Sequence, residues 1–183
     1  VIALCPNRFI QDQRVFEDIA RQHFRTTNNI LVFKEVGLKG IGNFDYVLVQ
    51  HKPLSTEIQD FAVVEFQGGQ TTSSGELVRA FKEFRRGVAV GEKNYNFGLN
   101  MADIWKRAFT QVLNKGIVLE NWGHKIYWVT QEEVFSDLVR RYRLGTLKFN
   151  EKHSTVFALY DLAPSGMSYN LVHKRFTSAS IDE

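Results

Sequence analysis

Two segments that should form buried strands carry polar side chains able to do chemistry. Asp45 lies within Asn43–Gln50, and Glu65 lies near the end of Phe61–Gln67. A carboxylate in an apolar strand is costly unless it is paired, hydrogen-bonded or bound to a metal ion. Because side chains alternate along a strand, Gln67 shares a face with Glu65. These residues therefore mark a candidate site.

The chemistry that such a set favours is metal-assisted hydrolysis of a phosphodiester. If the two strands pair as antiparallel neighbours, Asp45 lies beside Glu65, and two carboxylates that close would repel each other. A divalent cation removes the conflict, and oxygen ligands favour Mg²⁺, with Mn²⁺ as a substitute. Glu35, at the end of an earlier strand, would bring a third carboxylate to the same rim. The cation would lower the pKa of a bound water and hold the phosphate.

Gln67 differs from the acids in what it can contribute. It carries no charge, so it cannot act as a base at neutral pH, but it can orient the water or the phosphate by hydrogen bonds. A simpler interpretation of the acids also stands. Acidic residues near strand ends are often solvated, or paired with a nearby lysine or arginine.

The elements that position these residues follow from periodicity and from glycine, proline and capping signals. Apolar spacing predicts helices over Arg8–Phe24, Glu76–Arg86, Asn100–Lys115 (ended by Gly116), and from Thr130 and Glu133 onward. Strands are predicted over Ile30–Phe33, Asn43–Gln50, Phe61–Gln67, Ile126–Val129 and Thr155–Tyr160, with the last dozen residues as loop or tail. This order predicts an α/β fold with a mixed sheet flanked by helices, built on an αβββαβ core.

Composition limits the class of protein. The 183 residues are 44% hydrophobic and 23% charged, which suits a single folded domain over residues 1–183. No apolar run approaches the roughly 18 residues that cross a bilayer. The net charge of +3 permits nucleic-acid binding without showing it. One cysteine, Cys5, excludes an internal disulfide and fits a reducing compartment.

Five short segments occur in an order that resembles a known family. They are LCPNRFIQD (Leu4–Asp12), KEVGLKG (Lys34–Gly40), GNFDYVLV (Gly42–Val49), VVEFQ (Val63–Gln67) and IWKRAFTQVLNK (Ile104–Lys115). Together they resemble the NotI-like type II restriction endonucleases, a branch of the PD-(D/E)xK superfamily that carries E-x-Q in place of E-x-K. The departures from the superfamily pattern are Phe44 where a proline usually precedes the aspartate, and Gln67 where a lysine is usual.

The resemblance implies roles for the candidate residues. Glu35, Asp45 and Glu65 would bind Mg²⁺, with help from the backbone carbonyl of Phe66, and Gln67 would replace the superfamily lysine. The activity implied is cleavage of double-stranded DNA at a specific site by a homodimer, and dimeric symmetry fits a palindromic target. A cognate DNA methyltransferase acting on the same site and a bacterial cytoplasmic location are also implied.

Cys5 has two interpretations. In the resembled family a Cys-Pro-Asn segment belongs to a small N-terminal metal module, binding iron or zinc, whose other cysteines lie upstream. One thiolate cannot make such a site, which needs about four ligands. We therefore expect either a longer native chain, in which Cys5 is a structural metal ligand, or loss of the module, in which Cys5 is a buried, inert thiol.

Candidate contacts to DNA lie in four regions, two of which are alternatives for reading bases. Phosphate contacts are expected from Arg85 and Arg86, near the end of the predicted second helix, and from Lys106 and Arg107. Base contacts are expected from the loop Gln70–Ser74, especially Gln70 and Thr71, or alternatively from Arg140–Lys152. The interleaved Glu76, Glu83 and Glu92 also fit a solvated helix face around Arg85 and Arg86.

Two further functions remain open at this stage. The chain could be a repair or recombination nuclease of the same superfamily that prefers DNA structure over sequence. It could also be a catalytically inactive DNA-binding domain, because Gln67 replaces the usual lysine.

Overall fold

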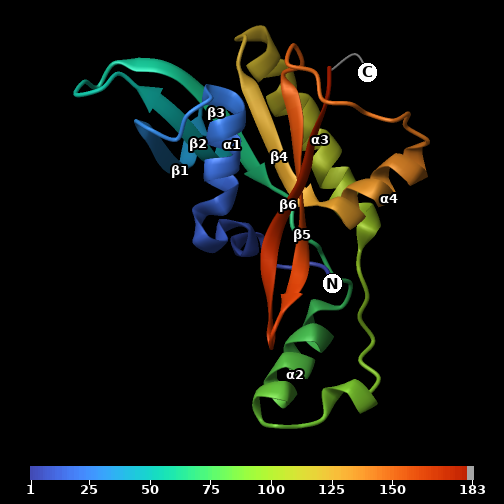
Figure 1. Ribbon diagram of the computed structural model, residues 1–183. Helices are drawn as coiled ribbons and strands as arrows, with labels where there is room; N and C mark the ends of the chain where they lie inside the picture. The colour runs from blue at the N-terminus through green and yellow to red at the C-terminus, as the bar shows by residue number, and fades with distance from the viewer. Residues whose placement is uncertain (181–183) are drawn as a thin grey trace.

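Six strands form one mixed sheet in the order β1-β2-β3-β4-β5-β6 in the computed structural model, which describes residues 1–180. The strands are β1 (Ile30–Leu38), β2 (Gly42–His51), β3 (Ile58–Phe66), β4 (Lys125–Gln131), β5 (Thr155–Ser165) and β6 (Ser168–Ala179). The first three strands and the last pair are antiparallel, whereas β3, β4 and β5 run parallel. The expected mixed sheet flanked by helices is confirmed (Figure 1).

Helices cover both faces of this sheet (Figure 1). The helical elements are η1 (Pro6–Gln13), α1 (Arg14–Phe24), α2 (Ser74–Arg85), η2 (Val90–Glu92), α3 (Met101–Asn121) and α4 (Glu132–Tyr142). On β2, Leu48 faces the core beneath α1, and its neighbour Val47 packs with Leu119 of α3 on the opposite face. This period-two alternation decides which side chains of β2 and β3 meet α3.

The first helix differs from the prediction. A continuous helix was expected over Arg8–Phe24, but a 3-10 segment gives way to α1 at Arg14. Asp12 and Gln13 have φ values of 53° and 55°, a left-handed conformation that a helix cannot continue through. Arg14 then anchors the turn, because its Nη1 donates to the carbonyl of Leu171 at 2.6 Å.

Other boundaries were also wrong. The first strand was expected to end at Phe33, but β1 runs to Leu38, so Glu35 lies within the strand and not at its end. The third helix does not end at Gly116 but runs to Asn121, because the buried residues Lys115, Gly116 and Leu119 hold it against the sheet. This packing outweighs the roughly 1 kcal/mol that glycine costs in a helix. The last dozen residues are not a loop, since β6 extends to Ala179 as an edge strand paired with β5. Residues 181–183 of that expected tail lie outside the described residues.

Helix α2 projects away from the sheet on an arm (Figure 1). The two ends of the arm are clamped together, because Asn100 N donates to the Gln70 carbonyl at 2.7 Å and Thr72 N donates to the Gly98 carbonyl at 2.9 Å. Ala80 is the buried residue of α2, whereas Phe81 is 59% exposed. The arm therefore contributes little to the core.

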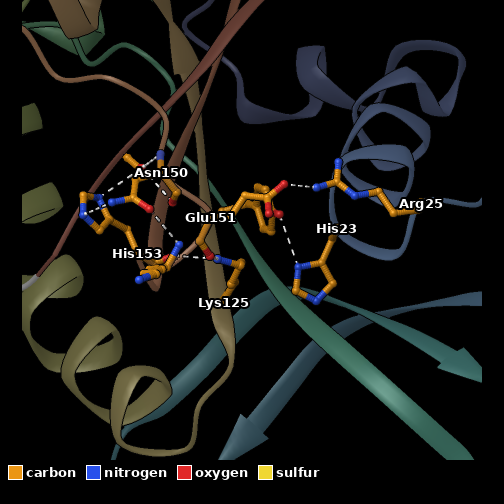
Figure 2. Close-up of polar contacts among 9 residues, drawn as sticks. His23, Arg25, Lys125, Asn150, Glu151 and His153 are labelled. Carbon is orange, nitrogen blue, oxygen red and sulfur yellow. Dashed lines mark hydrogen bonds and ion pairs between the residues drawn. The ribbon is translucent and has the colours of Figure 1, made fainter.

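A polar cluster fastens the end of α1 to β4 and to the turn before β5 (Figure 2). Arg25 forms an ion pair with Glu151, and Lys125 Nζ donates to the carbonyl of His153 at 2.7 Å. Burial lowers the pKa of the Lys125 ammonium. These contacts hold three elements together at one edge of the core.

Within the same region, His23 makes stability depend on pH. Its Nε2 lies 3.1 Å from Asp60 Oδ2 and its Nδ1 lies 3.2 Å from the Tyr127 hydroxyl. Burial lowers the pKa of His23; Asp60 opposes this effect, and Lys125 and His124 add to it. As the pH falls through 6.5, the unfolded chain takes up a proton before the folded one, so the free energy of unfolding decreases.

We expect this decrease to reach at most about 1.4 kcal/mol per pH unit below pH 6.5, the limit for one proton. Urea unfolding between pH 7.5 and 5 measures it. His23→Gln should make this slope less steep, and His173, whose pKa is also lowered by burial, should maintain part of it. Equal slopes for the His23→Gln and unaltered proteins would show that His23 does not titrate on unfolding.

In residues 1–180 no helix has the length and apolar character needed to cross a membrane.

Candidate active site

A cleft of about 440 Å³ opens where the ends of β2 and β3 meet helix α3. Asp45, Glu65, Gln67 and the more peripheral Glu35 all line it. Helix α3 supplies the opposite wall through Arg107, Gln111 and Lys115, which recur every four residues and so share one helix face. The structure thus brings every acid singled out in the sequence to one cleft.

Asp45 and Glu65 are neighbours across the β2–β3 pair. Tyr46 pairs with Val64 in an antiparallel register, and the next step along that register sets Asp45 opposite Glu65. Asp45 Oδ2 also accepts a hydrogen bond from the backbone N–H of Phe66 at 2.8 Å. The expected pairing of these two strands is confirmed, and both residues line the cleft that α3 closes on its other side.

Glu65 is buried, with 2% of its surface exposed, and it is paired with a lysine. Its Oε1 lies 2.7 Å from Lys115 Nζ, which also donates to the carbonyl of Asn43 at 2.7 Å. Burial raises the pKa of the Glu65 carboxyl, and the charge of Asp45 raises it further, whereas the Lys115 ammonium lowers it. Lys115 therefore offsets only part of the cost of burying this carboxylate, and the pKa of Glu65 stays raised, at about 7.

Glu35 sits at the rim of the cleft. Lys34 pairs with Tyr46 and Val36 with Phe44, so the register sets Glu35 opposite Asp45. Its φ of 54° is left-handed, which costs a residue of this kind about 1–2 kcal/mol. The side chain is 69% exposed and lies 3.3 Å from Lys34 Nζ. Strained backbone of this kind often accompanies functional sites.

Gln67 lies just past the end of β3, with its backbone fixed on both sides. Its N–H donates to the carbonyl of Val129 at 2.9 Å, and its carbonyl accepts from the Thr130 hydroxyl at 3.2 Å. The side-chain amide donates to the carbonyl of Gly68 at 3.0 Å. Its amide can be turned toward a bound molecule by breaking this one local hydrogen bond.

The N-terminal segment closes one side of the cleft. Gly69 N donates to the carbonyl of Ala3 at 2.7 Å, and Leu4 and Pro6 line the cleft beside it. A Cβ at Gly69 would come within 3.0–3.3 Å of this segment, so a larger residue would push the wall outward. The absent side chain at this glycine therefore lets the first residues of the chain reach the site.

The donor set suits a divalent cation. Asp45 and Glu65 present two carboxylates against the ammonium of Lys115, so these three groups, which form the floor of the cleft, carry one net negative charge when both carboxyls are ionised. Carboxylate oxygens are the ligands that Mg²⁺ prefers. Among residues 1–180, no three His, Cys, Asp or Glu side chains are arranged as a ready metal site. A cation here would rest on Asp45, Glu65 and the Phe66 carbonyl, with Glu35 more distant at the rim.

The predicted DNA-contacting residues separate into two groups. Arg107 and Gln70 line the cleft. Lys106 is exposed on α3 outside the cleft lining, and Thr71 forms a β-bridge with Leu99 at the root of the arm. Arg85 and Arg86 lie at the C-terminal end of α2, and neither lines the cleft.

Cys5 is exposed. The interpretation of this residue as a buried, inert thiol is therefore wrong, because the short segment that carries it runs over the surface before η1 begins. Its role as a metal ligand stays a prediction.

Lys115 was missed by reasoning from the sequence. It ends the segment Ile104–Lys115, and the expected helix stopped immediately after it, so it was given no role. Its spacing of four from Gln111 and eight from Arg107 was the available signal, since these intervals place all three on one helix face.

These features define a class of protein: an α/β fold of the restriction-endonuclease kind, with a cleft between strand ends and a helix that is lined by both carboxylates and basic side chains. A family model described as restriction endonuclease NotI matches residues 1–170. The chain therefore belongs to the NotI restriction endonuclease family and acts on DNA. The match extends well beyond Lys115, where the last of the five short segments ends. A comparison with curated proteins found no match.

Proposed function

We propose that the protein is a type II restriction endonuclease that hydrolyses phosphodiester bonds of double-stranded DNA at a specific site with Mg²⁺. The observation that carries this proposal is the convergence of Asp45, Glu65 and Gln67 with Arg107 of α3 in one cleft. Membership of the NotI family supports DNA as the substrate. The site would be an E-x-Q variant of the PD-(D/E)xK arrangement, formed by Glu65, Phe66 and Gln67.

The roles of the residues follow from their chemistry. Asp45, Glu65 and the Phe66 carbonyl would hold Mg²⁺, which when bound lowers the pKa of water and balances charge on the phosphate. Glu35 would add a carboxylate from the rim, consistent with its place opposite Asp45 in the strand register. Gln67 would donate hydrogen bonds that orient the water or the phosphate.

DNA would enter along α3. Arg107 lies at the exposed end of the helix face that runs down to the buried Lys115, which suits a contact to the phosphate backbone. Gln70 lines the cleft at the point where the arm begins and is suited to a base edge. Lys106, Thr71, Arg85 and Arg86 would make outer contacts.

Arg107→Ala is expected to weaken binding to all duplexes alike and to reduce the slope of log K against log salt by about one, because one phosphate contact is lost. Fluorescence anisotropy in Ca²⁺ at several salt concentrations measures this slope. Arg21→Ala is the matched control, since Arg21 is an exposed arginine on α1, on the opposite face of the sheet. Equal slopes for the two variants would remove Arg107 from the DNA interface.

A homodimer acting on a palindromic target, with a cognate methyltransferase modifying the same site, completes the proposal. A two-fold symmetric enzyme matches the symmetry of such a target. Cys5 would bind a structural metal only in a longer chain that supplies further ligands.

Incubation of plasmid and phage DNA with the protein and Mg²⁺ tests this function. Discrete, reproducible fragments are the expected result. Preferential cutting of flaps or junctions over linear duplex would instead identify a repair or recombination nuclease. Failure to cut in any divalent cation, with DNA binding retained, would identify an inactive DNA-binding domain.

A further inference from the structure

The floor of the cleft holds a buried lysine, a residue that is seldom buried without a specific partner. Lys115 is 6% exposed. Its Nζ contacts Glu65 Oε1 and the Asn43 carbonyl, each at 2.7 Å, and lies 5.5 Å from the centre of the Phe44 ring. The ammonium therefore has a fixed position beside the candidate catalytic carboxylate.

Helix α3 can place the Lys115 ammonium beside Glu65 because the helix does not end at Gly116. The helix continues to Asn121 and buries Leu119, which anchors the turn that carries Lys115. The same helix face carries Arg107 to the cleft. Two basic side chains, Arg107 near the surface and the buried Lys115, are thus spaced along one helix face that leads to the two carboxylates.

Lys115 changes the net charge at the floor of the cleft. With both carboxyls ionised, the state that a bound divalent cation would favour, Asp45 and Glu65 contribute two negative charges and Lys115 one positive charge, a net charge of minus one. A bound divalent cation would bring the floor to one net positive charge, which complements a phosphodiester. Without Lys115 the same floor would be neutral and would lose that attraction.

Gln67, two positions after Glu65, cannot supply this positive charge, because its side chain is uncharged. An ammonium has three N–H donors, and the contacts within residues 1–180 use two of them on Glu65 and Asn43. The third is left for an acceptor in the cleft.

We propose that Lys115 is a positioning residue of the cutting site, holding the Glu65 carboxylate in place and supplying the fixed positive charge that Gln67 lacks. This inference rests on the proposed function. A purely structural ion pair would behave differently: removing one partner of a buried pair lowers the free energy of unfolding, but the protein that remains folded need not lose turnover.

The first test replaces Lys115 by methionine, which is similar in length but uncharged. We expect kcat for plasmid cleavage to fall by about a hundredfold or more, the scale for losing a fixed charge or donor. KM should stay within about threefold, because the outer DNA contacts remain.

Titration calorimetry should show Mn²⁺ binding as tight as in the unaltered protein, or tighter, since a nearby positive charge has been removed. Lys52→Met, an exposed lysine on the β2–β3 turn, is the matched control and should cut normally.

The second test restores the amine. Lys115→Cys in a Cys5→Ser background is alkylated with 2-bromoethylamine in denaturant and refolded, which rebuilds a side chain of lysine length ending in an ammonium. Cleavage should recover to at least about a tenth of the rate of the Cys5→Ser protein taken through the same treatment, a loss of no more than about 1.4 kcal/mol.

The outcomes separate the two claims. Normal cutting by Lys115→Met, or no recovery in the refolded, aminoethylated protein, overturns the role of Lys115 and leaves the nuclease function standing. Loss of Mn²⁺ binding together with cleavage in Lys115→Met also overturns it, because that pattern indicates a collapsed site. If the unaltered protein cuts no DNA with any divalent cation, both claims fall together.

Discussion

Glu65→Gln is expected to reduce DNA cleavage by about a thousandfold or more, the scale seen when a group acting directly in a reaction is removed. The substitution keeps the shape of the side chain but removes the charge that would bind Mg²⁺. It also leaves the buried Lys115 ammonium without its anionic partner. Cleavage rates on plasmid DNA, measured beside binding to the same DNA in Ca²⁺, separate loss of chemistry from loss of affinity.

Asp45→Asn should behave in the same way, because Asp45 is the other carboxylate of the pair. Its hydrogen bond from Phe66 N can be kept by the asparagine oxygen, so folding should survive. Glu57→Gln is the matched control, since Glu57 is 66% exposed and lies on the turn between β2 and β3. Cutting retained by Glu65→Gln or Asp45→Asn would overturn the assignment of the site.

The second large effect concerns the wall of the cleft. Phe9 of η1 is fully buried, and its ring centre lies 5.7 Å from that of Phe66, the residue between Glu65 and Gln67. Phe9→Ala should lower the free energy of unfolding by about 3–5 kcal/mol, through lost burial and the cavity it leaves. Urea unfolding measures this change as a lower midpoint with an unchanged slope.

Phe81→Ala provides the comparison for this prediction. Phe81 is 59% exposed on α2, so its removal should change stability by no more than about 0.5 kcal/mol. Similar losses for the two variants would mean that η1 is not an integral part of the core. A small loss for Phe9→Ala would carry the same conclusion.

The sequence was most informative where local pattern and burial agree. Strands β2 and β3 follow from their short apolar runs, which are buried on both faces of the sheet, and the interruption of those runs by Asp45 and Glu65 pointed directly to the cleft. Which face each side chain takes is a local property of a strand. The face shared by Glu65 and Gln67, opposite to that of Phe66, could therefore be predicted.

Other features depend on contacts between distant parts of the chain. Lys115 reaches Glu65 across 50 positions of sequence, and Gly116 stays helical only because the sheet buries that turn. Strand β6 is polar because it is an edge strand, so its pairing with β5 left little apolar signal. The left-handed φ of Glu35 likewise has no local signature, since glutamate seldom adopts it.

The most direct test of the central claim is to sequence the ends produced when genomic DNA from an unmethylated source is digested with the protein and Mg²⁺. Cutting at a specific site by a symmetric enzyme predicts that nearly all ends share one palindromic sequence, cut at a constant position. The same digestion with Asp45→Asn should yield no such ends. Ends scattered without a common sequence, or identical ends from the Asp45→Asn protein, would contradict the account.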